Sequence, residues 1–378
     1  MIPLSVPNIS GNEWKYIKEC LDTNWVSSVG SYVGRFEKML ADFVGSKYAI
    51  ATSNGTSALH VSLQLAGVNS SHCVIVPNIT FIASVNAVKY TGASPIFMDI
   101  DESDWQIDLD LLERFLSRQT IVKNGACHLK ENSKIIKAIM PVHVLGNVCD
   151  MDKLMTIADQ YKLVVIEDST ESLGSYFKGK HTGTLGLMGN FSFNGNKIIS
   201  TGGGGMIVTD DEKLAMQAKH ITTQAKASPD EYYHDQVGYN YRLVNLLAAM
   251  GVAQMEQLPG FLIRKTEIYK RYISGLEKVK GIGFQKSEAA VKPNNWLFTI
   301  TTNRKADLLK RLKENGVEAR PLWVPMNKLP MFTDELFVSE SDVSQKIYDH
   351  CVSLPCSTGI KDEEIDQVIS LVQGLSHE

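Results

Sequence analysis

One lysine, one aspartate and a cluster of small polar residues stand where they could act together on a ligand. Lys197 lies between the aromatic run FSFNG and the glycines of TGGGG. The order of a phosphate-binding P-loop is absent, because this lysine precedes the glycines and no Gly-Lys-Ser/Thr follows them. Asp168 ends the apolar run LVVIED, and Gly55, Thr56 and Ser57 follow the run KYAIATSN. A role of Lys197 in a P-loop is therefore excluded, and its amine must serve another function.

These groups match the needs of pyridoxal 5′-phosphate. A lysine amine can bond covalently to the aldehyde of this cofactor, which then withdraws electrons from its substrate. A carboxylate within about 4–6 Å of the pyridine nitrogen raises the pKa of that nitrogen by about one to three units, and Asp168 could supply it. A phosphate favours hydroxyl groups and the N–H groups of a helix N-terminus. The residues available for the phosphate are Gly55, Thr56, Ser57 and Ser192. Phe81 could stack on the ring.

Taken one at a time, these residues also have ordinary structural explanations. An aspartate at a strand end often caps a helix or turn, and Gly-Thr-Ser is a common helix start. Phe81 alone would fit a core, and Lys197 alone would fit a surface. It is their order and conjunction that favour a cofactor site.

Short apolar runs along the first two thirds of the chain must position these side chains. Strands are expected at CVIVP from residue 73, PIFMDI from 95, KAIMPVHVLG from 137, LVVIED from 163, NFSFNG from 190 and GMIVTD from 205, beside the run before Gly55. Helical patterns lie between several of them, including 56–66 and 151–161. Continuous apolar strands alternating with helices predict an α/β fold with a mainly parallel sheet of about seven strands. Ligands of such sheets bind at the carboxyl ends of the strands, where Asp168 stands.

The pattern changes after Asn245. A helix there is expected to break at Pro259-Gly260, and a second helix is expected from Phe261 to about Val279. Strands are predicted at 296–302 and 317–323, and helices at 305–316, 340–353 and 361–375. This predicts a large domain over residues 1–255 and a smaller C-terminal α/β domain over residues 256–378, with the first 25 or so residues available to pack against the smaller one.

Composition narrows the class of protein. The chain has 378 residues, 44% hydrophobic and 21% charged, which is typical of a globular protein with a sizeable core. A net charge of −4 argues against a nucleic-acid partner. The six cysteines form no CxxC pair, so we expect a reducing cytoplasm and neither a metal site nor a disulfide framework. No signal peptide and no membrane span are expected.

The conjunction of motifs resembles the DegT/DnrJ/EryC1/StrS nucleotide-sugar aminotransferases, which have the aspartate-aminotransferase-like architecture called fold type I. The match runs nearly end to end and includes SNGTSALHVSL, VPNITFIASVNAVKYTGASPIFMDID, VVIEDSTESLGSYFKGKHTGTLG and VGYNYRLVNLLAAMGVAQMEQL. The pattern S-F-x-x-x-K followed by T-G-x-G-G is highly specific to this family. The resemblance implies that Lys197 bonds to the cofactor aldehyde and that Asp168 pairs with the pyridine nitrogen. It also implies that Thr56, Ser57 and Ser192 bind the phosphate and that Phe81 stacks on the ring.

The resemblance further implies a homodimer with shared active sites. In relatives, the asparagine corresponding to Asn240 in GYNYR reaches the phosphate of the partner subunit. Residues expected to line the sugar pocket, by the same resemblance, are Lys226, Tyr241, Arg242, Trp323 and Asn327.

Two positions depart from the commoner family pattern. Glu171 stands three residues after Asp168, where relatives often carry Gln or His, and it would face the phenolate-like oxygen of the cofactor unless one of the two holds a proton. Gly203 stands where relatives often have glutamate. The four glycines with NGNKIIS most resemble the LegC-like branch, whose members use L-glutamate to aminate C4 of UDP-4-keto-6-deoxy-N-acetylglucosamine for surface glycans such as those of bacillosamine or legionaminic type and lipopolysaccharide.

Other functions remain open from the sequence alone. An aminotransferase acting on GDP-4-keto-6-deoxymannose, which is a perosamine synthase, has the same chemistry. Sugar dehydratases of the family carry histidine where Lys197 stands, so the lysine favours transamination. A non-catalytic relative would not need the retained Lys, Asp and Ser set. A nicotinamide-dependent oxidoreductase would need GxGxxG after the first strand, where SNGTSAL stands instead.

Overall fold

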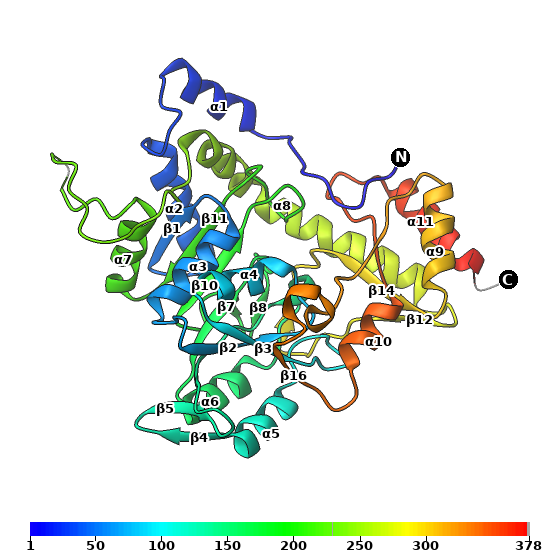
Figure 1. Ribbon diagram of the computed structural model, residues 1–378. Coiled ribbons are helices and arrows are strands. Elements are labelled where there is room, and N and C mark those ends of the chain that lie inside the picture. Colours follow the sequence, from blue (N-terminus) through cyan, green and yellow to red (C-terminus); the bar gives the residue numbers. More distant parts are fainter. Residues whose placement is uncertain (229, 376–378) are drawn as a thin grey trace.

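A large, mainly parallel sheet forms the centre of the molecule in a computed structural model that describes residues 1–228 and 230–375 (Figure 1). Along the sheet the strands are β1 (Tyr48–Thr52), β11 (Gly205–Thr209), β10 (Met188–Ser192), β7 (Val164–Asp168), β6 (Ile135–Ile139), β2 (His72–Pro77), β3 (Ser94–Met98) and β16 (Leu336–Val338). From β10 to β16 every neighbouring pair is parallel, and β11 is antiparallel to both of its neighbours. The hairpin of β4 (Thr120–Lys123) and β5 (Ala126–Leu129) joins at β6. The predicted α/β fold is confirmed, and the seven predicted strands are all present.

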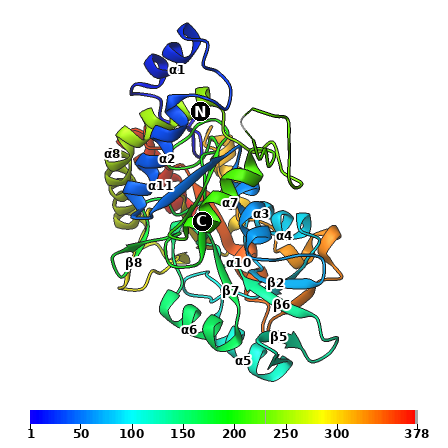
Figure 2. The ribbon, with the colours of Figure 1, turned by 90° about the vertical axis from the view of Figure 1, so that its left-hand side faces the viewer.

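Helices cover both faces of this sheet because its strands are apolar on both sides. Along β2, Val74 and Val76 enter one core cluster while Cys73 and Ile75 enter another, as the alternation of side chains along a strand requires. One face is covered by α3 (Gly55–Leu65), α4 (Ile82–Tyr90) and α7 (Glu212–Thr222). The other is covered by α2 (Ser31–Val44), α5 (Leu109–Gln119), α6 (Met151–Tyr161) and the first half of α8 (Asn245–Leu276). Figure 2 shows α2 and α8 on the side opposite to α3 and α4.

A second, antiparallel sheet forms in the C-terminal third. Its order is β12 (Ile282–Phe284), β14 (Phe298–Thr302), β17 (Cys351–Leu354) and β15 (Arg320–Pro321). The end of α8, α9 (Lys305–Glu314) and α11 (Asp362–Gly374) pack on it, and α10 (Val343–His350) precedes β17. A three-stranded sheet of β8 (Tyr176–Phe177), β9 (Lys180–His181) and β13 (Val291–Lys292) connects the two regions.

The N-terminal residues lie against the second sheet region. Ile2 bridges to Val317, and the N–H of Cys356 donates to the carbonyl of Leu4. α1 (Glu13–Asp22) then packs on α8. We propose that the domain division falls within α8, near the expected residue 255, although β16 returns from the C-terminal part to the large sheet.

The predicted break at Pro259-Gly260 is wrong. α8 runs through both residues as one helix. A proline inside a helix costs about 3 kcal/mol, since it removes one hydrogen bond. The buried side chains of Leu258 and Phe261 flank the exposed proline, and tertiary packing of that face outweighs the cost. By length and composition alone α8 could also cross a membrane, but half of its most apolar window is buried in the protein, as in a core helix.

The helix predicted over residues 340–353 is also partly wrong. α10 ends at His350, and the next four residues form β17. Cys351, Val352 and Leu354 are fully buried, and this short, mostly apolar run pairs with β14 and β15 instead of extending the helix.

Candidate active site

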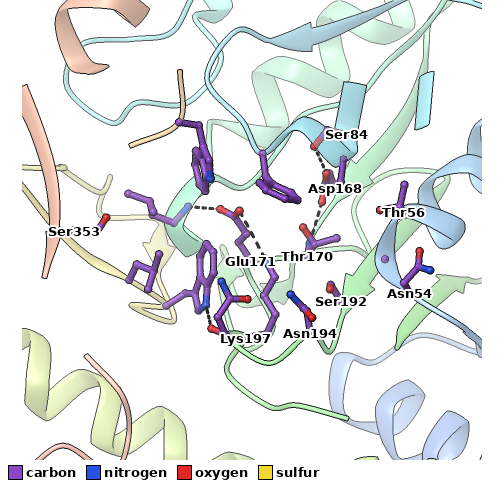
Figure 3. Close-up of a pocket in the computed structure, with 18 of the residues that line it drawn as sticks. Asn54, Thr56, Ser84, Asp168, Thr170, Glu171, Ser192, Asn194, Lys197 and Ser353 are labelled. Atoms are coloured by element: carbon purple, nitrogen blue, oxygen red, sulfur yellow. Dashed lines mark hydrogen bonds and ion pairs between the residues drawn. The ribbon is translucent and has the colours of Figure 1, made fainter. Parts of the chain in front are cut away.

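A cavity of about 390 Å³ lies between the two sheets and receives the ends of several strands of the large one (Figure 3). Residues predicted as site residues that line it are Gly55, Thr56, Phe81, Asp168, Glu171, Ser192, Lys197 and Trp323. β15 contributes Arg320 from the opposite side. The lysine and the aspartate that the cofactor hypothesis requires therefore share one cavity.

Asp168 is held rigidly at the carboxyl end of β7. Its side chain is buried, the hydroxyl of Ser84 donates to Oδ2 at 2.6 Å, and the backbone N–H of Thr170 donates to Oδ1 at 3.1 Å. Hydrogen bonds to a carboxylate are short and strong. The carboxylate is thus fixed in position before any ligand enters.

Lys197 follows β10 and enters the cavity from a tight turn, in which its N–H donates to the carbonyl of Asn194 at 3.0 Å. Its Nζ lies 3.8 Å from Oε1 of Glu171 and 4.0 Å from the ring centroid of Trp296. Burial lowers the pKa of the Lys197 amine, and the neighbouring carboxylates partly counter this effect. A lysine with a lowered pKa is a better nucleophile near neutral pH.

Glu171 is a buried carboxyl beside that amine. Burial raises the pKa of Glu171 to about 7, and the nearby Lys197 partly offsets the increase. The N–H of Leu145 donates to Oε2 at 2.9 Å. The position that departs from the family pattern thus contacts the predicted catalytic lysine.

The start of α3 provides an anion-binding surface at the other side of the cavity. Asn54 caps the helix, since its Oδ1 accepts from the N–H of Ser57 at 2.8 Å. The first N–H groups of any helix lack partners within it, and here Gly55 and Thr56 line the cavity. A Cβ at Gly55 would lie 2.9 Å from Cβ of Ser192, so the close approach of helix and strand requires glycine.

Ser57 does not line the cavity. Its N–H is used by the cap, and its hydroxyl lies 3.2 Å from that of Ser53. Ser57 follows Thr56 in the sequence, but successive residues of a helix point in different directions. Thr56 therefore faces the cavity and Ser57 does not.

Four of the residues predicted for the substrate, and Asn240, lie outside the cavity. Arg242 forms an ion pair with Glu37, and Asn327 exchanges hydrogen bonds with Asn78. Tyr241 stacks on Tyr239, with ring centroids 4.8 Å apart. Lys226 and Asn240 are exposed in the segment between α7 and α8, which projects from the body in Figure 1.

The structure adds site residues that the sequence motifs do not predict. Ser84 and Trp296 contact the aspartate and the lysine although they are 84 and about 100 residues away from them in the chain. No local sequence signal marks such contacts. Arg320 stands three residues before Trp323, which was expected to line the sugar pocket, and this nearness in the sequence is the signal that could have identified it.

The donor set fits pyridoxal phosphate. One end of the cavity presents a buried carboxylate, another presents an amine, and the start of α3 with the Ser192 hydroxyl presents anion-binding donors. These are the three kinds of group that the pyridine nitrogen, the aldehyde and the phosphate require.

The fold and the site together define an aminotransferase of fold type I. The chain belongs to the DegT/DnrJ/EryC1/StrS aminotransferase family, whose model matches residues 7–373. Membership confirms the predicted class of enzyme and its cofactor, pyridoxal 5′-phosphate.

Relatives with known names cover almost the whole chain. GDP-perosamine synthase of Escherichia coli O157:H7 is 38% identical over 96% of this chain and 95% of its own length. GDP-perosamine synthase of Caulobacter vibrioides is 36% identical over 98% and 96%. A DegT DnrJ EryC1 StrS aminotransferase structure from Brucella abortus superposes with a TM-score of 0.90 at 24% identity, over 97% of this chain and 96% of that one, which shows the shared fold.

Proposed function

We propose that this enzyme transfers the amino group of L-glutamate to C4 of a nucleotide-linked 4-keto-6-deoxy sugar. The observation that carries the proposal is the convergence of Lys197 and Asp168 on one cavity beside the start of α3. GDP-4-keto-6-deoxymannose is the favoured acceptor, because both relatives described above are GDP-perosamine synthases. This reverses the preference drawn from the LegC-like motifs, whose branch no relative described above supports.

Each residue of the cavity has its own role in the proposed reaction. When bound, pyridoxal phosphate withdraws electrons from the amino acid so that the proton on its Cα can leave. Lys197 would hold the cofactor through its amine and, once released, would take up and give back a proton at Nζ, acting first as base and then as acid. Asp168 keeps the pyridine nitrogen protonated. Glutamate leaves as 2-oxoglutarate, and the amino group passes to C4 of the sugar.

The remaining groups hold the reactants. Thr56, Ser192 and the N–H groups at the start of α3 bind the phosphate. Phe81, half exposed at the start of α4, stacks on the ring. Arg320 and Trp323, at the side of the second sheet, are placed to meet the anionic and planar parts of the substrates.

A homodimer in the cytoplasm completes the proposal. The segment between α7 and α8 exposes Tyr232, Tyr233 and Val237 by 96%, 60% and 81%. Large apolar side chains gathered on one projecting segment are typical of an interaction surface. In the dimer Asn240 of this segment reaches the phosphate of the partner subunit.

UDP-4-keto-6-deoxy-N-acetylglucosamine is the second candidate acceptor. The stretch NGNKIIS followed by four glycines, which borders the cavity at Asn194, Lys197 and Gly203, favours it.

One assay separates these candidates. The purified enzyme is incubated with glutamate and with GDP-, UDP- and dTDP-linked 4-keto-6-deoxy sugars, and the release of 2-oxoglutarate is followed. We expect the fastest release with GDP-4-keto-6-deoxymannose. Lys197→Ala should abolish release and the visible absorbance of the lysine-bound cofactor, whereas Lys219→Ala, an exposed lysine of α7, should preserve both. Absence of release with every sugar from enzyme that shows this absorbance would refute the proposal.

A further inference from the structure

The carboxyl group of Glu171 is turned toward the amine of Lys197. One oxygen, Oε2, accepts the N–H of Leu145 at 2.9 Å, and the other, Oε1, lies 3.8 Å from Nζ of Lys197 (Figure 3). The side chain of Glu171 is 2% exposed. The hydrogen bond from Leu145 fixes the carboxyl group, and its other oxygen faces Nζ of Lys197.

The turn that donates to Glu171 has an unusual backbone conformation. Leu145 lies in the left-handed region, at φ +60°, within the turn Val144–Gly146, a conformation that is uncommon for residues other than glycine. The hydroxyl of Ser175 holds the turn by donating to the carbonyl of Gly146 at 2.6 Å. The amide of Asn294 holds the backbone of Glu171 by donating to its carbonyl at 2.8 Å. An unusual backbone that is supported from several sides often marks a functional site.

Burial acts in opposite directions on the two partners. It raises the pKa of Glu171 and lowers that of Lys197, while each group partly offsets the change in the other. Asp168 raises the pKa of both. Arg320 lines the same cavity. The ionic pair and the pair of neutral groups hold the same number of protons, and such coupled groups titrate as a unit.

Building on the proposed aminotransferase function, we propose that Glu171 is the proton partner of Lys197. One proton passes from Nζ to Oε1, the N–H bond breaks as the O–H bond forms, and a neutral amine and a neutral carboxyl remain with no change in their summed charge. A movement of the lysine by about 1 Å brings the two atoms to hydrogen-bond distance. The pair can thus hold one proton on either group, and the amine becomes neutral without releasing that proton to water.

The test measures the pKa of Lys197 in cofactor-free enzyme. Acetic anhydride modifies neutral amines, and mass spectrometry of the peptide that contains Lys197 gives its rate of modification at each pH. Glu171→Gln keeps an oxygen that can accept from the N–H of Leu145, but its amide has no charge and no titratable proton. We expect the pKa of Lys197 to fall by about one to three units in this variant.

Two further variants make the result decisive. Glu131→Gln removes the same charge from an exposed turn and should leave the pKa of Lys197 unchanged. Glu171→Asp withdraws the carboxylate by one methylene and should lower the pKa by less than Glu171→Gln, so it serves also if the glutamine variant fails to fold. An unchanged pKa of Lys197 in a folded Glu171 variant overturns the proposal and leaves Glu171 as a support of the loop. This result is independent of sugar turnover, so failure of the proposed function is distinguished from failure of the pair.

Discussion

Ser84 is the residue that holds Asp168 in place. Its hydroxyl donates to the buried carboxylate at 2.6 Å and lies 2.9 Å from the hydroxyl of Thr80. A chain of hydroxyl groups therefore leads from α4 to the residue proposed to face the pyridine nitrogen. The position of the Asp168 carboxylate in the site therefore depends on this contact.

Ser84→Ala should weaken cofactor binding by roughly tenfold to a hundredfold, because a hydrogen bond to a charged group contributes about 1.5–3 kcal/mol. Titration of cofactor-free enzyme with pyridoxal phosphate, followed by absorbance, gives the dissociation constant. Ser117→Ala, at an exposed position of α5, serves as the control and should bind normally. Equal affinity of the two variants would show that Asp168 needs no support from Ser84.

At the scale of residues, the sequence predicted those site members that follow strands directly. Asp168, Ser192 and Lys197 are of this kind, because the carboxyl ends of parallel strands meet at one edge. Ser84 and Trp296 reach the site through tertiary packing and leave no trace in local spacing. Arg242 was expected to face the substrate, but a buried arginine needs a carboxylate, and Glu37 supplies it inside the fold.

At the scale of elements, α8 is the part that links the regions around the cavity. Its first half packs on α1 and α2, and its second half packs on α11. Gly260, in the middle of this helix, is exposed, and an added Cβ would meet no atom within 4 Å. Gly251 faces Phe36, where a Cβ would lie 2.8 Å from the ring.

These two glycines predict opposite effects of the same substitution. Gly260→Ala should raise the free energy of unfolding by about 0.5–1 kcal/mol, because alanine loses less conformational entropy in a helix. Gly251→Ala should lower it, because Phe36 has to move in a close-packed core. Urea denaturation of the cofactor-free variants measures both changes, and stabilisation by Gly251→Ala would contradict the packing described here.

The strands were predicted well and α8 was not, for one physical reason. A buried parallel strand is a short apolar run that is visible locally. Whether a helix survives a Pro-Gly pair depends on what its two halves pack against, which is a long-range property. The same reason explains β17, whose strand conformation depends on pairing with β14 and β15.

At the scale of the whole molecule, the proposed dimer predicts complementation between two defective chains. Lys197→Ala and Asn240→Ala should each be nearly inactive as homodimers. When both are expressed together, half of the dimers are mixed and each mixed dimer has one intact site, so about a quarter of wild-type activity should return. Sedimentation equilibrium should give twice the 41.9 kDa of one chain.

An outcome without recovery would mean that the two residues act within one chain or not at all. A fully active species of 41.9 kDa would likewise exclude the shared site. A control mixture of Lys197→Ala with Asp168→Ala, two residues that line the same cavity of one chain, should stay inactive.

The pairing of β16 with the large sheet affects how this protein folds while it is being synthesised. The pairing of Leu336–Val338 with β3, and the burial of Met326 and Phe332 in the adjacent core cluster, come from residues translated near the end of the chain. While the ribosome is still adding the C-terminal third, the nascent sheet presents an open edge at β3 that another polypeptide could pair with. A product that ends within α8 at residue 255 would keep that edge permanently, so the first 255 residues should associate or precipitate rather than behave as an independent module.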